Sequence, residues 1–562
     1  MTNTASKPTL TFQSLIKSEW RVFALFWLIT FVLYLPAAKA GMVGDFFGWL
    51  LTIRTASFSD YVNRPDSLSL YQFTQLVTYA YYKMFGANPW AWHLLNVTLH
   101  ALNCLLLFSL MRRLFEDSHI KEAVNIALGA ILLYCFAPHN SEVIVHEPCF
   151  HYLLAFLVFL LILRWVQQFH HTQKNKYIWM AVLLYFPSTY ALELFYLTPW
   201  FVLTLAIYYR VVLAYDKAIF RKVLLWFFVP QLVLFGLYEV ALSTIIHMHV
   251  AHVNIHLAKN GFAYLTKPPQ YLFHMLFLGR YFPLDFRRQV YAFCETAIGL
   301  VIFYSLVAAI LLLFVTRMRW AGIKAKVAIL LFLWTLFTLA IVVPLDFPQL
   351  QLVLFDRYTY FMLPFMYAMM LLLLSIIPNR KIAAFIFVGY ACVNIYLTVK
   401  TNYYWKRSAY IVNRLVKEVP DPGNKTLILL NLPENMNGML MIGSQPTSVW
   451  KLAHNLFSDH KINTTVYDVA SYNMVSPGDG AHVKVLNDST LTVTLNQWGT
   501  WWWYRYRGAV SYENDDYRLE MKDVGHWYQL TLKHPASEYM LLYQKADMWR
   551  VVDWNKKDED QD

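Results

Sequence analysis

The chain has 562 residues, of which 58% are apolar and 15% are charged, and its formal net charge is +12. Soluble globular proteins average about 25% charged residues, so this composition excludes a purely soluble protein. The basic surplus lies within residues 1–400, whereas residues 401–562 are slightly acidic. Basic residues between apolar segments indicate the cytoplasmic loops of a membrane protein rather than nucleic-acid binding.

Apolar segments in the first 400 residues predict the membrane topology. A transmembrane helix needs about 20 mostly apolar residues. The first segment follows Lys7 and Lys17 and is too long for a cleaved signal peptide, so we expect a retained anchor. Eleven segments are candidates, of which the third and the fifth are short: 20–40, 90–111, 123–138, 148–165, 177–190, 193–210, 222–246, 294–316, 326–346, 358–378 and 382–400.

Positive charges in the connecting loops predict the orientation. They fall in alternate short loops, and the positive-inside rule places such loops in the cytoplasm. Eleven spans with a cytoplasmic N-terminus put the C-terminal region on the outer side. We therefore predict a multi-pass membrane protein whose C-terminal domain lies on the outer side. The absence of eukaryotic trafficking signals favours a bacterial inner membrane, in which case this domain is periplasmic. The basic loops contain Arg112, Arg113 and Lys121; Arg164, Lys174 and Lys176; Arg210, Lys217, Arg221 and Lys222; Arg317, Arg319, Lys324 and Lys326; and Arg380 and Lys381.

Two predicted outer loops, 41–89 and 246–293, are long. Both carry apolar residues at helical spacing between polar ones, which favours helices lying in the membrane interface. In the second loop, we expect Arg280, Arg287 and Arg288 to form an ordinary interfacial belt, with a lipid head-group patch as the alternative.

Three parts are predicted along the chain. Residues 1–400 form the transmembrane domain, and 401–424 form an amphipathic linker helix that ends before Pro420. Residues 425–562 form a small β-rich domain, because short alternating runs there are separated by Gly, Pro, Asn and Asp. All five cysteines precede this domain, so no disulfide framework holds it. The predicted strands are 426–432, 464–469, 482–486, 491–495, 501–506, 528–532 and 539–543.

Several polar residues are candidates for chemistry. Asp45 lies just past the first segment beside aromatic residues, and an ionisable group at a membrane boundary is a functional candidate; a solvated loop residue is the alternative. His252 and His256 have the i,i+4 spacing that can chelate a divalent metal ion, although an amphipathic surface explains them equally well. We expect His93 and His100 to be satisfied by neighbouring helices or by a bound donor rather than by a metal ion.

The aromatic group in the C-terminal domain has three interpretations. Its side chains fill the β core, which we expect, or they insert into the membrane surface, or their ring faces form a platform for sugars. The group comprises Trp498, Trp501, Trp502, Trp503, Tyr504 and Tyr506.

Short motifs in residues 20–400 resemble those of GT-C-type membrane glycosyltransferases, in particular the relatives of protein O-mannosyltransferases and the tetratricopeptide-bearing mannosyltransferases. The likeness rests on the order and spacing of the motifs, since none is specific alone, and the C-terminal region does not resemble tetratricopeptide repeats. The motifs are RPDSL at 64–68, FGANPW at 85–90, HLLN at 93–96, HALN at 100–103, PHNSEV at 138–143 with Asn140 where the family usually has His, and DRYTY at 356–360.

The resemblance implies a GT-C-like fold and an inverting transfer of a sugar from a polyprenyl-phosphate-type lipid to a protein hydroxyl or an envelope glycan or lipid. Asp45 is then the expected general base, and Glu142 assists it, orients the acceptor or binds a metal ion. Donor phosphate contacts are expected from the outer loops, and a divalent ion such as Mg²⁺ or Mn²⁺ is a possible cofactor. The expected phosphate contacts are Arg357, Tyr358, His249 and His252; further site candidates are Arg64, His139 and Glu193.

Three other interpretations remain open. An enzyme of the same fold could modify lipid A or a surface polysaccharide. A transporter or flippase of lipid-linked sugars would line a path at mid-membrane with broken helices, whereas the candidates here gather at one predicted face. A non-catalytic scaffold could simply display the C-terminal domain.

Overall fold

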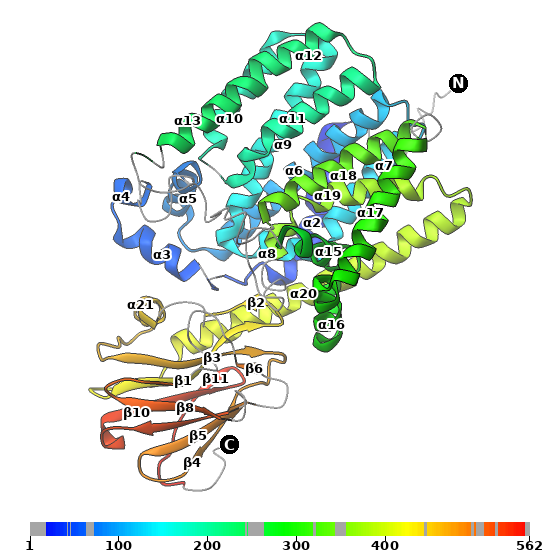
Figure 1. The fold of residues 1–562 in the computed structure, drawn as a ribbon. Helices are drawn as coiled ribbons and strands as arrows, with labels where there is room; N and C mark the ends of the chain where they lie inside the picture. Colours follow the sequence, from blue (N-terminus) through cyan, green and yellow to red (C-terminus); the bar gives the residue numbers. More distant parts are fainter. Residues whose placement is uncertain are drawn as a thin grey trace, which may run out of the picture.

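The computed structural model describes residues 18–41, 43–44, 46–62, 72–190, 192–241, 244, 263–317, 322–342, 356–442, 447–495, 500–501, 511–522 and 527–556. The chain is mostly helical as far as Lys417 and forms β-sheets from Thr426 onward (Figure 1). The helices before the sheets are α2 (Glu19–Tyr34), α3 (Phe46–Thr55), α4 (Phe58–Val62), α5 (Gln72–Phe85), α6 (Pro89–Asp117), α7 (Ala123–Phe136), α8 (Ser141–Val145), α9 (Phe150–Thr172), α10 (Asn175–Ser188), α11 (Thr198–Ile207), α12 (Lys217–Val223), α13 (Val229–Ala241), α15 (Ala263–Leu276), α16 (Leu284–Glu295), α17 (Ala297–Arg317), α18 (Ile323–Val342), α19 (Leu363–Leu374) and α20 (Arg380–Lys417).

Every predicted apolar segment contains helix, but eleven membrane spans are not confirmed. Within the described residues, seven helices are long and apolar enough to cross a membrane, or nine if each of two bent helix pairs forms one span. The bent pairs join α7 to Pro138–Val145 at 55° and Asp285–Glu295 to the start of α17 at 76°. Two predicted segments give helices of 14 and 12 residues, α10 and α19, which are too short to cross alone.

Local sequence explains where the long helices begin. Asn88 caps α6 by accepting a hydrogen bond from the backbone N–H of Trp90, and Pro89 occupies the first helical position, where its missing N–H costs nothing. Asn379 caps α20 in the same way. Helix α20 then continues for 38 residues without a break, so the predicted last span and the predicted linker helix form a single helix.

Ion pairs join several of the basic loops to one another at one end of the helical part. Glu122, which precedes α7, pairs with Lys324 at 3.5 Å and with Arg380 at 2.5 Å. Asp117, at the end of α6, pairs with His171 at 2.9 Å. The β region lies at the other end of the helices (Figure 1). The loops that share positive charge thus share one end, as the topology predicts; which side of a membrane they face remains a prediction.

The C-terminal region contains two sheets. The first has the order β11-β10-β1-β3-β6 with β2 paired to β1, and the second has the order β4-β5-β9-β8-β7. Strands β10, β1 and β3 are parallel, and helix α21 (Thr447–Phe457) connects β1 to β3, as a parallel pair requires. The strands are β1 (Thr426–Met436), β2 (Met439–Leu440), β3 (Val466–Met474), β4 (Ala481–Val485), β5 (Thr490–Leu495), β6 (Thr500–Trp501), β7 (Tyr512–Glu513), β8 (Tyr517–Lys522), β9 (Trp527–Leu532), β10 (Tyr539–Lys545) and β11 (Met548–Val551).

The predicted strands agree with the structure except at 501–506, of which the structure describes Trp501 alone, in β6. The other members of the predicted aromatic group lie outside the described residues, so none of the interpretations of the group is tested.

The last turns of α20 hold the β region in place. Leu415 and Val416 of α20 accept hydrogen bonds from Trp549 Nε1 at 2.8 Å and from His454 Nδ1 at 2.6 Å. Arg414 pairs with Asp547 at 2.7 Å. These contacts fix the orientation of the sheets relative to the helices, which places the β1–β2 hairpin against the helix ends.

Candidate functional site

Six polar residues from four separate segments meet at the helix ends nearest the β region. Five are buried, and the side chain of the sixth, Arg357, is 14% exposed. Burying a charge is costly unless it is paired, and the two carboxylates here match the two guanidinium groups. We call this group the polar cluster: His139, Glu142, His274, Arg280, Asp356 and Arg357.

Asp356 is the centre of the polar cluster. Its carboxylate accepts a hydrogen bond from His274 Nε2 at 2.7 Å and forms an ion pair with Arg280. Burial alone would raise the pKa of Asp356, but the Arg280 charge and the His274 hydrogen bond outweigh it and hold the pKa at about 2. Asp356 is therefore a permanent anion that fixes Arg280.

Glu142 is the main partner of Arg357. One carboxylate oxygen accepts the backbone N–H of Arg357 at 2.8 Å, and the other accepts its guanidinium at 2.9 Å. The Glu142 side chain is 4% exposed. Because both oxygens are engaged, Glu142 in this arrangement positions Arg357 rather than serving as a free base or metal ligand.

Aromatic side chains surround Arg357, whose side chain is 14% exposed. The Arg357 guanidinium lies 5.4 Å from the centre of the Tyr358 ring in a cation–π contact, and Tyr358 contacts Tyr152 edge to face. Trp49 of α3 stacks on His151 next to Tyr152. A guanidinium among aromatic rings suits an anionic group that carries a sugar.

The loop between α2 and α3 enters the site beside α8 and strand β2. The backbone carbonyl of Val43 contacts His146 Nε2 at 3.2 Å, and the Gly44 N–H donates to the carbonyl of Met441 at 2.6 Å. A Cβ added to Gly44, whose φ is +52°, would lie 3.1 Å from Leu440 Cβ and 3.5 Å from His146 Nε2. Gly44 is thus a point of close approach between this loop, α8 and strand β2.

The β1–β2 hairpin completes the cluster from the other side. Its turn is Asn437-Gly438 with φ of +51° and +82°, the residue pair that a tight two-residue hairpin favours. The turn exposes the Asn437 carbonyl, which accepts a hydrogen bond from Arg280 Nη2 at 2.8 Å. Arg280 therefore joins the carboxylate of Asp356 to the β region.

The prediction of an interfacial belt is wrong for Arg280. Its side chain is 5% exposed and buried in the ion pair with Asp356, because the short helix Gly279–Tyr281 turns it toward the helix ends. Arg287 is also largely enclosed, whereas the side chain of Arg288 is 49% exposed and contacts Asp285.

The structure brings some of the predicted site residues together. Glu142, His139, Arg357 and Tyr358 all lie in or beside the polar cluster. Glu193 begins a short helix beyond α10, and its side chain lies outside the described residues. Five predicted residues also lie outside the described residues: Asp45, Arg64, His249, His252 and His256.

Sequence reasoning missed His274, Asp356 and His146 as site residues. The signal available for Asp356 was its position next to Arg357. His274 has no comparable signal, because its partner lies 82 residues away.

Two groups at the site have ligand atoms close enough to hold a metal ion: His139, His274 and Asp356, and Glu142, His146 and Cys149. Mg²⁺ prefers oxygen ligands in octahedral geometry, and each group offers a single carboxylate. Arg280 also competes for Asp356. These side chains therefore fit Mg²⁺ poorly, and a metal requirement remains a prediction.

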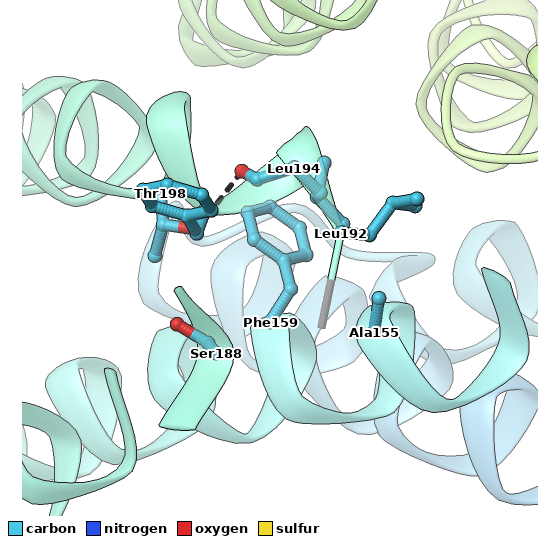
Figure 2. Close-up of a pocket in the computed structure, with 7 residues that line it drawn as sticks. Ala155, Phe159, Ser188, Leu192, Leu194 and Thr198 are labelled. Atoms are coloured by element: carbon cyan, nitrogen blue, oxygen red, sulfur yellow. Dashed lines mark hydrogen bonds between the residues drawn. The ribbon is translucent and has the colours of Figure 1, made fainter. Parts of the chain in front are cut away.

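A small apolar pocket lies within the helical part (Figure 2). Its empty volume of about 190 Å³ is below the ~300–1,000 Å³ of typical small-molecule sites. The hydroxyls of Ser188 and Thr198 donate to Tyr185 and Leu194 carbonyls of their own segments, so the pocket suits a few methylene groups rather than a sugar. It is lined by Ala155, Phe159, Ser188, Leu192, Leu194, Phe195 and Thr198.

No protein-family model matches the chain, and no curated protein matches it.

Proposed function

We propose that the chain is an inverting membrane glycosyltransferase of the GT-C type. It moves a sugar from a polyprenyl-phosphate-type lipid to a hydroxyl of a protein, or of an envelope glycan or lipid, on the outer face of the membrane. The observation that carries the proposal is the convergence of Val43 and Gly44, the polar cluster and the β1–β2 hairpin at one end of the helices. Gly44 immediately precedes Asp45, the proposed base.

The proposed reaction uses a carboxylate as the general base and a guanidinium to stabilise the leaving group. A hydroxyl acceptor is a weak nucleophile near neutral pH, and Asp45 removes its proton as the sugar is attacked. The departing lipid phosphate gains negative charge, which the positive charge of Arg357 stabilises. Glu142 holds Arg357 in place through the two hydrogen bonds described above.

In this proposal the β region binds the acceptor. It contacts α20 through hydrogen bonds from Trp549 and His454, and its hairpin contacts Arg280. A periplasmic β domain in this position would hold an acceptor protein or glycan over the loops that carry the proposed base.

A transporter or flippase of lipid-linked sugars is the second candidate. The two bent helix pairs favour it, because transporters build their sites from broken helices. The buried charges favour the enzyme, since they gather at the helix ends next to the hairpin rather than along a path through the helices.

The decisive experiment uses detergent-solubilised full-length protein, a radiolabelled polyprenyl-phosphate sugar and cell-envelope acceptors. We expect covalent transfer, lost by at least about 100-fold in Asp45→Asn because the base is removed. Asp60→Asn is the matched control, since Asp60 lies in the same loop and accepts a hydrogen bond from the Ser57 hydroxyl on the exposed surface. Wild-type transfer by Asp45→Asn would remove Asp45 as the base. Translocation of the lipid in vesicles without transfer would favour the flippase, and an EDTA arm tests metal dependence.

A further inference from the structure

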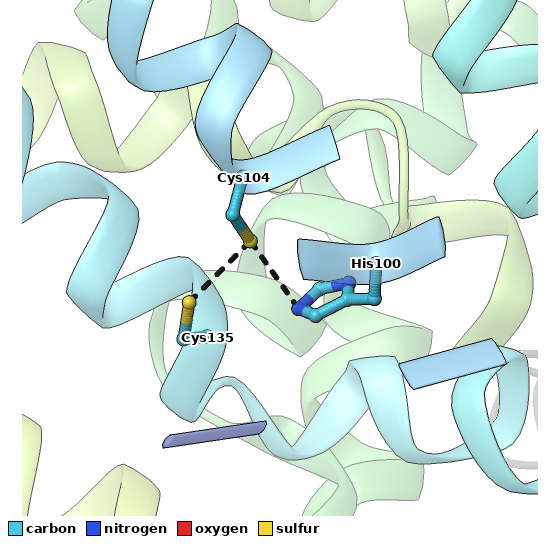
Figure 3. A group of neighbouring side chains, drawn as sticks. All are labelled: His100, Cys104 and Cys135. Carbon is cyan, nitrogen blue, oxygen red and sulfur yellow. Dashed lines mark hydrogen bonds between the residues drawn. The ribbon is translucent and has the colours of Figure 1, made fainter. Parts of the chain in front are cut away.

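Three side chains with metal-binding atoms, none of them part of the polar cluster, face one another inside the helical part. His100 and Cys104 come from α6 and Cys135 from α7 (Figure 3). Cys104 Sγ lies 3.4 Å from Cys135 Sγ and 3.5 Å from His100 Nε2. All three residues are completely buried, with 0% exposure.

Helix geometry explains why the three side chains meet. His100 and Cys104 are four residues apart, so they project from the same face of α6. Helix α7 packs against that face and presents Cys135 to it. The one ligand atom that each side chain offers lies within 4.8 Å of the others.

The imidazole of His100 is oriented as it would be in a metal ligand. Its Nδ1 lies 2.9 Å from the Tyr360 hydroxyl, which also accepts a hydrogen bond from Asn103 Nδ2 at 3.2 Å. Metal-binding histidines usually donate the N–H of the other ring nitrogen to an oxygen. With Nδ1 donating to Tyr360, the lone pair of Nε2 points at the two sulfur atoms.

We propose that His100, Cys104 and Cys135 bind one soft metal ion, Zn²⁺ or Cu⁺. Thiolate and imidazole ligands select these ions over Mg²⁺ or Ca²⁺. Zn²⁺ with two thiolates and a neutral imidazole has zero net charge, which removes the cost of placing thiolates in an apolar interior. Each thiol that becomes a ligand loses its proton to solvent when the metal binds.

The ion would stabilise the helices next to the polar cluster. It would join α6 to α7 just before the bend at which α7 leads to Pro138–Val145, the segment that carries His139 and Glu142. Tyr360, whose hydroxyl contacts His100 Nδ1, follows Asp356 and Arg357 in the same segment. This site does not depend on the proposed glycosyl transfer.

Metal analysis of the purified full-length protein in detergent tests the proposal. After washing with EDTA, and after separate loading with Zn²⁺ or with Cu⁺ under reducing conditions, we expect about one tightly held ion per chain for one of the two metals. The Cys104→Ala/Cys135→Ala double variant should retain at least about tenfold less of it. Cys392→Ala is the matched control and should retain the ion, because Cys392 is exposed on α20.

Two further measurements make the outcome independent of folding. X-ray absorption should show metal–sulfur distances of about 2.3 Å if the ion is Zn²⁺. Conservative Cys→Ser variants that elute as the wild-type does in size-exclusion chromatography should also lose the ion. The proposal is overturned if neither metal is retained, or if the double variant retains as much as the Cys392→Ala control.

Discussion

The two ends of the helical part both carry ion pairs, but in very different surroundings. At the end facing the β region, the side chains of Arg280 and Asp356 are 5% and 1% exposed. At the opposite end, Glu122 is 32% exposed and its partner Arg380 is 62% exposed. The same pairing of guanidinium with carboxylate therefore has different consequences, because water screens the second pair and not the first.

This difference indicates what each end does. Exposed pairs contribute little to stability, and at the basic end they join loops that already follow the predicted charge pattern. Buried pairs cost desolvation and contribute less than packed apolar groups of equal volume. Charges retained in such a place are a reason to look for function there.

The largest effect is expected when one partner of the buried ion pair between Arg280 and Asp356 is removed. Asp356→Asn removes the anion and leaves the Arg280 charge buried, which should lower the free energy of unfolding by about 3–5 kcal/mol. Denaturant titration in detergent micelles measures it. A loss below about 1 kcal/mol would mean that water reaches Arg280 and that the two ends do not differ.

The next effect tests the contact between the first loop and the hairpin. Gly44→Ala places a Cβ at a positive φ and 3.1 Å from Leu440 Cβ, which should cost about 2–3 kcal/mol from strain and crowding together. Gly423→Ala is the matched control, because Gly423 has φ +58° with nothing within 4 Å. The same denaturant titration should show the smaller loss for Gly423→Ala, and equal losses would refute the close approach.

A smaller effect is expected in the pH dependence of stability, which tests the buried pair at Asp356. The pKa of Asp356 is held at about 2, below the ~3.9 of an unfolded chain. The stabilisation is therefore complete above the unfolded pKa and is lost as the pH falls toward the folded one. The difference in melting temperature between wild type and Asp356→Asn should narrow steadily from about pH 5 to pH 3; a constant difference would contradict the depressed pKa.

The sequence predicted the helices and most strands because these depend on local patterns. The apolar segments, the cap residues Asn88 and Asn379, and the alternation in β4 and β5 are all readable from neighbouring residues. The continuity of α20 was not predicted. Polar residues after Lys400 suggested a boundary, although the chain has no Pro or Gly there to end the helix.

The candidate site was predicted in part, and the limit is physical. Motif likeness singled out Glu142 and Arg357, which are 215 residues apart and in contact. No local pattern assigns Arg280 to Asp356, or either to the Asn437 turn, because such partners are set by how helices and hairpin pack. The same holds for Cys135, whose partners lie on another helix.

The smallest expected effect completes the comparison at the exposed end. Glu122→Gln removes the partner of both Lys324 and Arg380, yet it should lower the free energy of unfolding by at most about 1 kcal/mol. Raising the salt concentration to 1 M should reduce even this loss, since exposed charges are screened over about 3 Å there, whereas the loss in Asp356→Asn should persist. A salt-resistant loss above about 2 kcal/mol in Glu122→Gln would show that both ends rely on desolvated charge, and burial would no longer single out the polar cluster.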